Sequence, residues 1–272
     1  MIEDPRGRID YEESGTGPTV VLVPGSCSTG AAWRPMMAVW NGCFRCVTTS
    51  LLGYGGTAER RDPKAPTIGP EADAIEAVVQ KAGGPVHLIG HSFGGSVALV
   101  TTLRKRVPIA SLSIIEAPVA PLLRHLGEDE LYAGFNRMTD VYFAAFERGE
   151  PEAVAEMIDF YGGVGTFASW PPRLRAYASE TTYVNILDWS CGYAFPESAA
   201  QLGGIDVPTL ILWGGASPRA VQRANELLAD HVPGAERMTI AGAAHFMIAT
   251  HATEVAVAVA QHVAKADRAA VA

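Results

Sequence analysis

The first 116 residues alternate short apolar runs with helix-like stretches and Gly-rich turns. The runs at 20–23, 86–89 and 210–212 are continuous rather than alternating, which is typical of central parallel strands that are buried on both faces. Stretches with helical periodicity separate them, as crossover helices do. We therefore predict an α/β fold with a mostly parallel, doubly wound sheet. Strands are expected at 8–13, 19–24, 44–49, 86–90, 111–116, 209–213 and 237–240, and helices at 70–81, 93–106, 218–231 and 246–266.

This rhythm breaks down at 117–200, a segment that holds 14 of the 22 aromatic residues of the chain. We predict a helical cap inserted into a core made of 1–116 and 201–272. The aromatic side chains could form the core of a small helical layer, or line the underside of a lid over an apolar pocket, and the two roles are compatible. The expected pocket residues are Tyr142, Phe143, Trp170 and Trp189.

Composition narrows the classes of partner. Hydrophobic residues make up 48% of the chain, and its net charge of −8 argues against nucleic acid or an anionic membrane as the main partner. No apolar run reaches the roughly 20 residues of a membrane span, and the N-terminus lacks the features of a signal peptide, so the cytoplasm is the expected location. A small-molecule substrate is the expected partner, and the oligomeric state is left open, a homo-oligomer included.

Four cysteines in a chain of this size do not indicate a disulfide framework. Cys43 and Cys46 have the spacing of redox and zinc motifs, but no second pair or nearby histidine completes a ligand set. We therefore expect two buried thiols at the start of a strand, and neither a metal nor a cofactor.

The strongest chemical signal is the segment 86–96, in which an apolar strand leads into Gly90-His91-Ser92-Phe93-Gly94 and then into a helix. A serine on such a sharp turn needs small neighbours, because the backbone is strained and closely packed. The turn pushes the hydroxyl out over the carboxyl edge of the sheet and towards a helix N-terminus. We expect Ser92 to be a nucleophile.

With this motif, the chain resembles the α/β-hydrolase fold superfamily, specifically its small capped esterase, lyase and dehalogenase-like branch. The segment 21–26, followed by Trp33, is similar to the oxyanion loop of that family, although Pro24 replaces the usual histidine. The resemblance implies that the backbone N–H groups of Ser26 and Phe93 form the oxyanion hole. The segment 50–57 is similar to a structural turn of the family, with Ser50 in place of an aspartate.

The general base is expected at His245, which follows a predicted strand and a loop of small residues and matches the histidine position of the family. A serine is a weak nucleophile unless a base is positioned beside it. His91 and His251 are the competitors. His91 adjoins the nucleophile, where its side chain is expected to point away from the serine hydroxyl.

The acid departs from the usual pattern. Ser217 stands in the turn where most members of the family carry the aspartate of the triad, and a neutral hydroxyl cannot stabilise an imidazolium as a carboxylate does. Glu116, however, ends a predicted strand at the alternative acid position that some dehalogenase-like members use. We therefore expect Glu116 to complete a Ser-His-Glu triad.

These residues predict a serine hydrolase that cleaves a carboxylic ester or lactone with an apolar moiety through an acyl-enzyme. Ser92 argues against haloalkane dehalogenase and epoxide hydrolase chemistry, which by family resemblance uses a carboxylate nucleophile. Hydrolysis of a carbon–carbon bond in a β-diketone-like compound is one alternative. The other is a non-catalytic ligand-binding receptor or pseudoenzyme, for which the missing aspartate at Ser217 is the main support.

Overall fold

A single seven-stranded sheet forms the centre of the protein, in a computed structural model that describes residues 1–193 and 199–271. The strands are β1 (Glu12–Ser14), β2 (Thr19–Val23), β3 (Arg45–Thr48), β4 (Val86–His91), β5 (Ile109–Ile115), β6 (Thr209–Gly214) and β7 (Glu236–Ile240). The strand order is β1-β3-β2-β4-β5-β6-β7, and β1 pairs antiparallel to β3 while the other pairings are parallel. The predicted doubly wound sheet is therefore confirmed.

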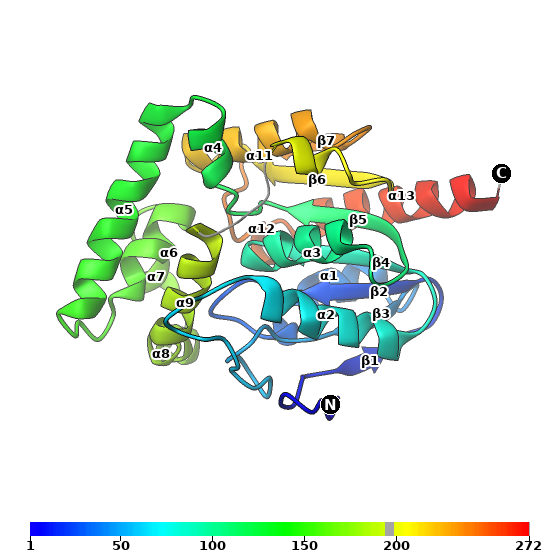
Figure 1. Cartoon of the computed structure of the whole chain (residues 1–272), viewed down its shortest axis with the longest axis horizontal. Helices are drawn as coiled ribbons and strands as arrows, with labels where there is room; N and C mark the ends of the chain where they lie inside the picture. Colours follow the sequence, from blue (N-terminus) through cyan, green and yellow to red (C-terminus); the bar gives the residue numbers. More distant parts are fainter. Residues whose placement is uncertain (194–198, 272) are drawn as a thin grey trace.

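Helices cover both faces of this sheet (Figure 1). The helices are η1 (Gly30–Trp33), α1 (Arg34–Trp40), α2 (Gly69–Ala82), α3 (Phe93–Arg104), α4 (Pro121–His125), α5 (Asp129–Glu147), α6 (Val154–Gly162), α7 (Thr166–Ser169), α8 (Pro172–Glu180), α9 (Thr182–Tyr193), α10 (Ala199–Leu202), α11 (Arg219–His231), α12 (Met247–Thr250) and α13 (Ala252–Val271). Because successive side chains of a strand point to opposite faces, Val21 and Val23 pack into the core beneath α2, α3 and α11, whereas Val20 and Leu22 pack beneath α1, α12 and α13.

Three local predictions were wrong. The strand expected at 8–13 is reduced to β1, because Asp10 bonds to the loop at 49–57 instead of a neighbouring strand: its N–H donates to Thr57 and its carbonyl accepts from Thr49. The helix expected at 246–266 is two helices that meet at His251, whose backbone is not helical. Cys46 is buried as expected, but Cys43 is exposed.

The turn that resembles the family pattern with Ser50 is completed by a carboxylate from elsewhere in the chain. Asp10 accepts hydrogen bonds from the Ser50 hydroxyl at 2.8 Å and from the backbone N–H of Gly56 at 2.9 Å. Asp10 therefore supplies the charged acceptor that an aspartate at position 50 would have provided, and the turn keeps a structural role.

Between β5 and β6 the chain forms the helices α4–α10, and its described residues contain no strand. Of these helices, α4–α9 gather beyond the end of β5, on the left of Figure 1. The segment has its own aromatic core, in which Phe135 stacks on Trp189 with ring centroids 5.3 Å apart. Residues 194–198 of the expected insertion lie outside the described residues. That this segment acts as a cap stays a prediction.

The first residue of the insertion is anchored to the core. Asn225 on α11 accepts a hydrogen bond from the backbone N–H of Ala117 at 3.0 Å and donates one to its carbonyl at 3.1 Å. Asn225 is fully buried, and its amide also donates to Val221 at 2.9 Å. This double hydrogen bond fixes the backbone directly after Glu116.

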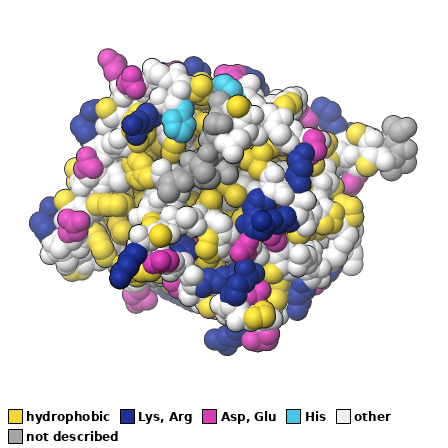
Figure 2. Space-filling model, viewed as in Figure 1, with side chains coloured by type: hydrophobic (Ala, Val, Ile, Leu, Met, Phe, Trp, Pro, Cys, Tyr) yellow, Lys and Arg dark blue, Asp and Glu magenta, His cyan; other side chains and the backbone are white. Residues whose placement is uncertain are grey.

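On the face of the molecule in Figure 2, basic side chains lie beside acidic ones. The ion pairs of the chain include those of Asp73 with Arg6, at 2.7 Å, and with Arg104. Such pairing offsets the basic side chains locally. Among the described helices, none combines the length and the apolar character needed to cross a membrane.

Candidate active site

Ser92 sits on the turn between β4 and α3 with a left-handed backbone, at φ 55° and ψ −132°. The turn is so tight that a Cβ on Gly90 would lie 2.3 Å from the carbonyl oxygen of Gly94. A Cβ on Gly94 would lie 2.2 Å from the carbonyl oxygen of Pro24. Only glycine fits at either position, which gives the Gly-x-Ser-x-Gly spacing its physical reason.

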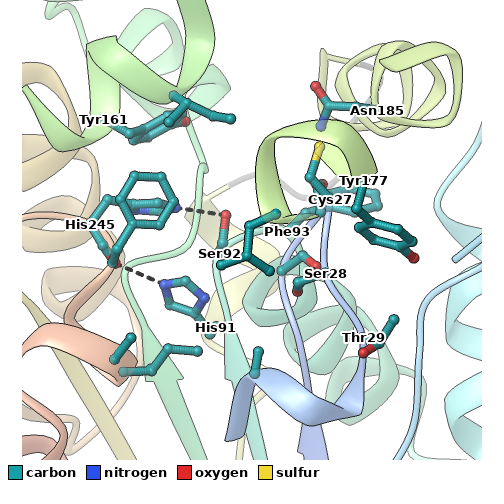
Figure 3. Close-up of a pocket in the computed structure, with 18 of the residues that line it drawn as sticks. Cys27, Ser28, Thr29, His91, Ser92, Phe93, Tyr161, Tyr177, Asn185 and His245 are labelled. Atoms are coloured by element: carbon teal, nitrogen blue, oxygen red, sulfur yellow. Dashed lines mark hydrogen bonds between the residues drawn. The ribbon is translucent and has the colours of Figure 1, made fainter. Parts of the chain in front are cut away.

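The structure brings the three predicted triad residues together. The Nε2 atom of His245 is 2.8 Å from the hydroxyl of Ser92, a contact drawn in Figure 3. The Nδ1 atom of the same ring is 2.8 Å from Oε1 of Glu116. Because a carboxylate only accepts, Nδ1–H donates to Glu116 and Nε2 accepts the serine proton. This is the tautomer that a serine nucleophile needs.

Glu116 directly follows β5 and is fully buried with φ 49°. Burial opposes its ionisation, but hydrogen bonds from His245, from the N–H of Gly214 at 2.7 Å and from the Ser217 hydroxyl outweigh it. The pKa of Glu116 therefore lies below its ordinary value of 4.5. Ser217, at the position where the resemblance led us to look for an aspartate, donates a hydrogen bond to a carboxylate that follows another strand.

Two side chains hold His245 from outside the predicted triad. The ring of Tyr161 lies over the imidazole, with centroids 4.2 Å apart and planes tilted by 31°. His91 donates from Nε2 to the backbone carbonyl of His245 at 2.9 Å and, as expected, does not bond to Ser92. Burial is the main cause that lowers the pKa of His91, to about 3. His91 is therefore neutral at physiological pH.

The two expected oxyanion donors lie beside the nucleophile. Ser26 and Phe93 both line the cavity that contains Ser92. Within the described part of the chain, neither backbone N–H donates a hydrogen bond, so both are free for an oxyanion. The loop approaches closely because residue 25 is glycine: a Cβ there would lie 2.8 Å from Cβ of Ser92.

A cavity of about 870 Å³ opens above Ser92, mostly between the sheet edge and the helices α6, α8 and α9. Trp170 and Trp189, two of the expected pocket residues, line it. Tyr142 and Phe143 are not among its lining residues in the described chain, so the prediction for these two needs correction. Tyr142 lies behind Trp189, with ring centroids 6.3 Å apart, and its hydroxyl donates to the lining residue Asn185.

Tyr161, Asn185 and the contact of His91 with His245 were missed in the sequence. Tyr161 and Asn185 lie on helices of the insertion, without a motif around them, and only the packing of α6 and α9 brings them to the cavity. No group of three or more His, Cys, Asp or Glu side chains suited to a metal ion occurs in residues 1–193 and 199–271.

The profile of the alpha/beta hydrolase family matches residues 20–259. The chain belongs to this family. A polyketide synthase, ThaQ of Burkholderia thailandensis, is 26% identical over 269 residues, which cover 92% of this chain but 12% of the synthase. Haloalkane dehalogenase 2 of Mycobacterium tuberculosis is 30% identical over 101 residues, or 37% of this chain and 35% of that protein. The matched residues of this α/β-hydrolase therefore cover less than two thirds of the length of either relative.

The fold is shared with solved structures. A thermophilic esterase from Thermogutta terrifontis superimposes with a TM-score of 0.71 at 22% identity, and the match covers 95% of this chain and 93% of the esterase. Identity at this level shows a common fold, and the chemistry has to be argued from the residues of the site.

Proposed function

We propose that this α/β-hydrolase is a serine hydrolase that cleaves a carboxylic ester or lactone with an apolar moiety. The observation that carries the proposal is the unbroken chain of hydrogen bonds from Ser92 through His245 to Glu116, with both links at 2.8 Å. Nucleophile, base and charged acid stand in the order that acyl transfer requires.

In the proposed reaction, the Ser92 hydroxyl loses its proton to Nε2 of His245 as its oxygen attacks the substrate carbonyl. The backbone N–H groups of Ser26 and Phe93 donate to the oxyanion that forms. The imidazolium, stabilised by Glu116, then gives its proton to the leaving alcohol. Water attacks the acyl-enzyme with His245 again as the base, and releases the acid and the free serine.

The nucleophile decides between carbonyl and halide substrates. Displacement of a halide by Ser92 would leave an alkyl ether on the enzyme, and an ether has no carbonyl that water could attack. An ester or lactone gives an acyl-enzyme, which water can hydrolyse. The apolar part of the substrate is expected to contact the side chains that line the cavity near Ser92, namely Met157, Ile158, Trp170 and Phe246.

The position of Glu116 removes the main argument for a non-catalytic ligand-binding receptor or pseudoenzyme. That argument rested on the absence of an acid at Ser217, and Glu116 lies within hydrogen-bond distance of both His245 and Ser217. An activated serine, unlike a mere binding pocket, reacts with electrophiles.

The experiment that tests the proposal is labelling with a fluorophosphonate probe, followed by mass spectrometry of the modified peptide. We expect modification of Ser92 in the parent and none in Ser92→Ala, which should also lose at least about 10³-fold in kcat towards p-nitrophenyl esters. Ser169→Ala is the matched control, because Ser169 is exposed and lies outside the cavity. Near-parent hydrolysis by Ser92→Ala would contradict the proposal. Lactones and β-diketones in the same assay then define the bond that is cleaved.

A further inference from the structure

One polar side chain of the cavity has an unused hydrogen-bond donor. Asn185 on α9 is 1% exposed and lines the cavity. Its Oδ1 accepts a hydrogen bond from the Tyr142 hydroxyl at 2.7 Å. Figure 3 shows its amide nitrogen turned the other way, towards the sulfur of Cys27 in the cavity wall. Among the described residues, none accepts a hydrogen bond from that nitrogen.

The Tyr142 contact fixes which end of the amide faces the cavity. The Tyr142 hydroxyl donates its proton to Oδ1 of Asn185. The amide N–H₂ is therefore the end left for a ligand. A donor that lines a cavity and has no partner in the protein is available to an oxygen of a ligand, since polar groups removed from water in folded proteins are usually hydrogen-bonded.

The charges behind Asn185 do not suit an anion. Asp188 lies three residues further along α9 and also lines the cavity. It accepts from the Tyr54 hydroxyl at 2.6 Å and pairs with Arg61. Arg61 is also paired with Glu59 at 2.5 Å and with Glu71 at 3.3 Å. One guanidinium thus faces three carboxyl groups, which leaves no surplus positive charge, so an uncharged acceptor fits this wall.

We propose that Nδ2 of Asn185 donates a hydrogen bond to an uncharged keto or hydroxyl oxygen of the substrate, distinct from the carbonyl that Ser92 attacks. The inference rests on the proposed function and narrows its substrate class. The preferred substrates are acyl esters or lactones that carry such an oxygen, rather than plain fatty acyl esters. A site built to bond an oxygen discriminates against an analogue that lacks it, because its donor is then left unpaired.

The test compares p-nitrophenyl esters of hexanoic acid with those of its keto and hydroxy derivatives, substituted at successive carbons. In the parent, we expect at least one keto and one hydroxy ester to have a higher kcat/KM than the plain ester. Asn185→Leu should lower the ratio of oxygenated to plain kcat/KM about 10–100-fold, with little change for the plain ester. Asn185→Asp should lose the keto preference and keep the hydroxyl preference, because a carboxylate accepts from a hydroxyl and cannot donate to a ketone.

Binding separates this inference from the proposed function. In a Ser92→Ala background, calorimetry with the methyl esters of the same acids should give the same preference in Kd, and addition of Asn185→Leu should remove it. If the fluorophosphonate probe failed to label Ser92 in the parent, the proposed function would be wrong, but the preference in Kd measured here would still stand.

Two results would overturn the role of Asn185: no preference for oxygenated esters in the parent, or an unchanged ratio in Asn185→Leu. An equal fall in kcat for every ester would also overturn it, because that result would mean that Asn185 acts on the carbonyl that Ser92 attacks, which all the esters share. If Asn185→Leu fails to unfold cooperatively, the opposite responses of keto and hydroxy esters in Asn185→Asp carry the test.

Discussion

Ser217 donates its hydroxyl to Glu116 and lies 2.9 Å from Oε1 and 2.7 Å from Oε2 of that carboxylate. Two positions from different strands therefore meet at one place beside His245. Ser217, where the resemblance led us to look for an aspartate, is a neutral hydrogen-bond donor, and the carboxylate beside His245 belongs to Glu116 at the end of β5. The relationship makes the roles of the two positions separable by mutation.

Glu116→Gln should lower kcat by about 10²–10⁴-fold, because an amide cannot balance the charge of the imidazolium and favours the wrong tautomer of His245. Ser217→Ala removes one of several hydrogen bonds to a carboxylate that stays in place, and should cost less than about 10-fold. The measurement is kcat on the preferred p-nitrophenyl ester.

The double variant Glu116→Gln with Ser217→Asp gives the sharper comparison, since it returns a carboxylate to the neighbouring position. It should recover part of the activity lost in Glu116→Gln alone. An unimpaired Glu116→Gln would rule out Glu116 as the acid, and a severe defect in Ser217→Ala would assign that role to the turn at 217.

The buried His91 should make the protein less stable in mild acid. Its pKa is about 3 when folded, against 6.5 when unfolded, so below pH 6.5 the unfolded chain binds a proton that the folded chain does not. This difference should remove about 2 kcal/mol from the free energy of unfolding between pH 7 and pH 5. Glu116 acts at lower pH, since its depressed pKa keeps its contribution until the pH falls below 4.5.

Urea denaturation of His91→Gln tests this origin, because glutamine can still donate to the carbonyl of His245 but does not titrate. Its free energy of unfolding should fall less than that of the parent between pH 7 and pH 5. Equal slopes for both proteins would show that His91 is not the group responsible.

Tyr161 should assist the base through its ring rather than its hydroxyl. The ring lies 4.2 Å from the imidazole of His245, and contacts between aromatic rings of this kind contribute about 0.5–1.5 kcal/mol beyond their buried area. Tyr161→Leu should therefore lower kcat about 3–10-fold, while Tyr161→Phe should keep nearly all activity. A comparable loss in Tyr161→Phe would instead point to the phenol group.

The two tryptophans of the cavity should respond differently to truncation. Trp170 is half-buried and packs edge-on against Phe246, so Trp170→Ala should raise KM for long acyl esters and leave kcat for the acetate nearly unchanged. Trp189 also stacks on Phe135 in the core of the insertion. Trp189→Ala should therefore lower the free energy of unfolding by about 3 kcal/mol, measured in urea. Equal loss on every ester in Trp170→Ala would argue against a role in substrate choice.

The sheet could be predicted because its strands have local signals. The continuous apolar runs at 20–23, 86–89 and 210–212 each fall within one of the strands β2, β4 and β6. The strand at 8–13 could not be placed in this way. Whether this segment forms a strand depends on hydrogen bonds between Asp10 and residues about 40 positions away, and no local sequence pattern predicts such bonds.

The same contrast holds at the site. The nucleophile and the histidine have local motifs, and Glu116 has the end of a strand, so the sequence could propose all three. Asn185 has no such signal, because its importance comes from the Tyr142 contact between α5 and α9. Helix packing in the insertion decides which aromatic residues reach the cavity, and this is why Trp170 lines it and Phe143 does not, although the sequence gives both the same aromatic signal.

The hydrogen bonds between Asn225 and Ala117 have a consequence for how such a protein can diversify. Asn225 belongs to α11, outside the insertion, and it holds the backbone at the point where the insertion begins. Recombination that exchanged the helices beyond residue 120 for those of a relative would leave this anchor, and Glu116 beside it, unchanged. Such an exchange would replace the cavity walls that α6, α8 and α9 contribute and would keep the carboxylate of Glu116 in its place.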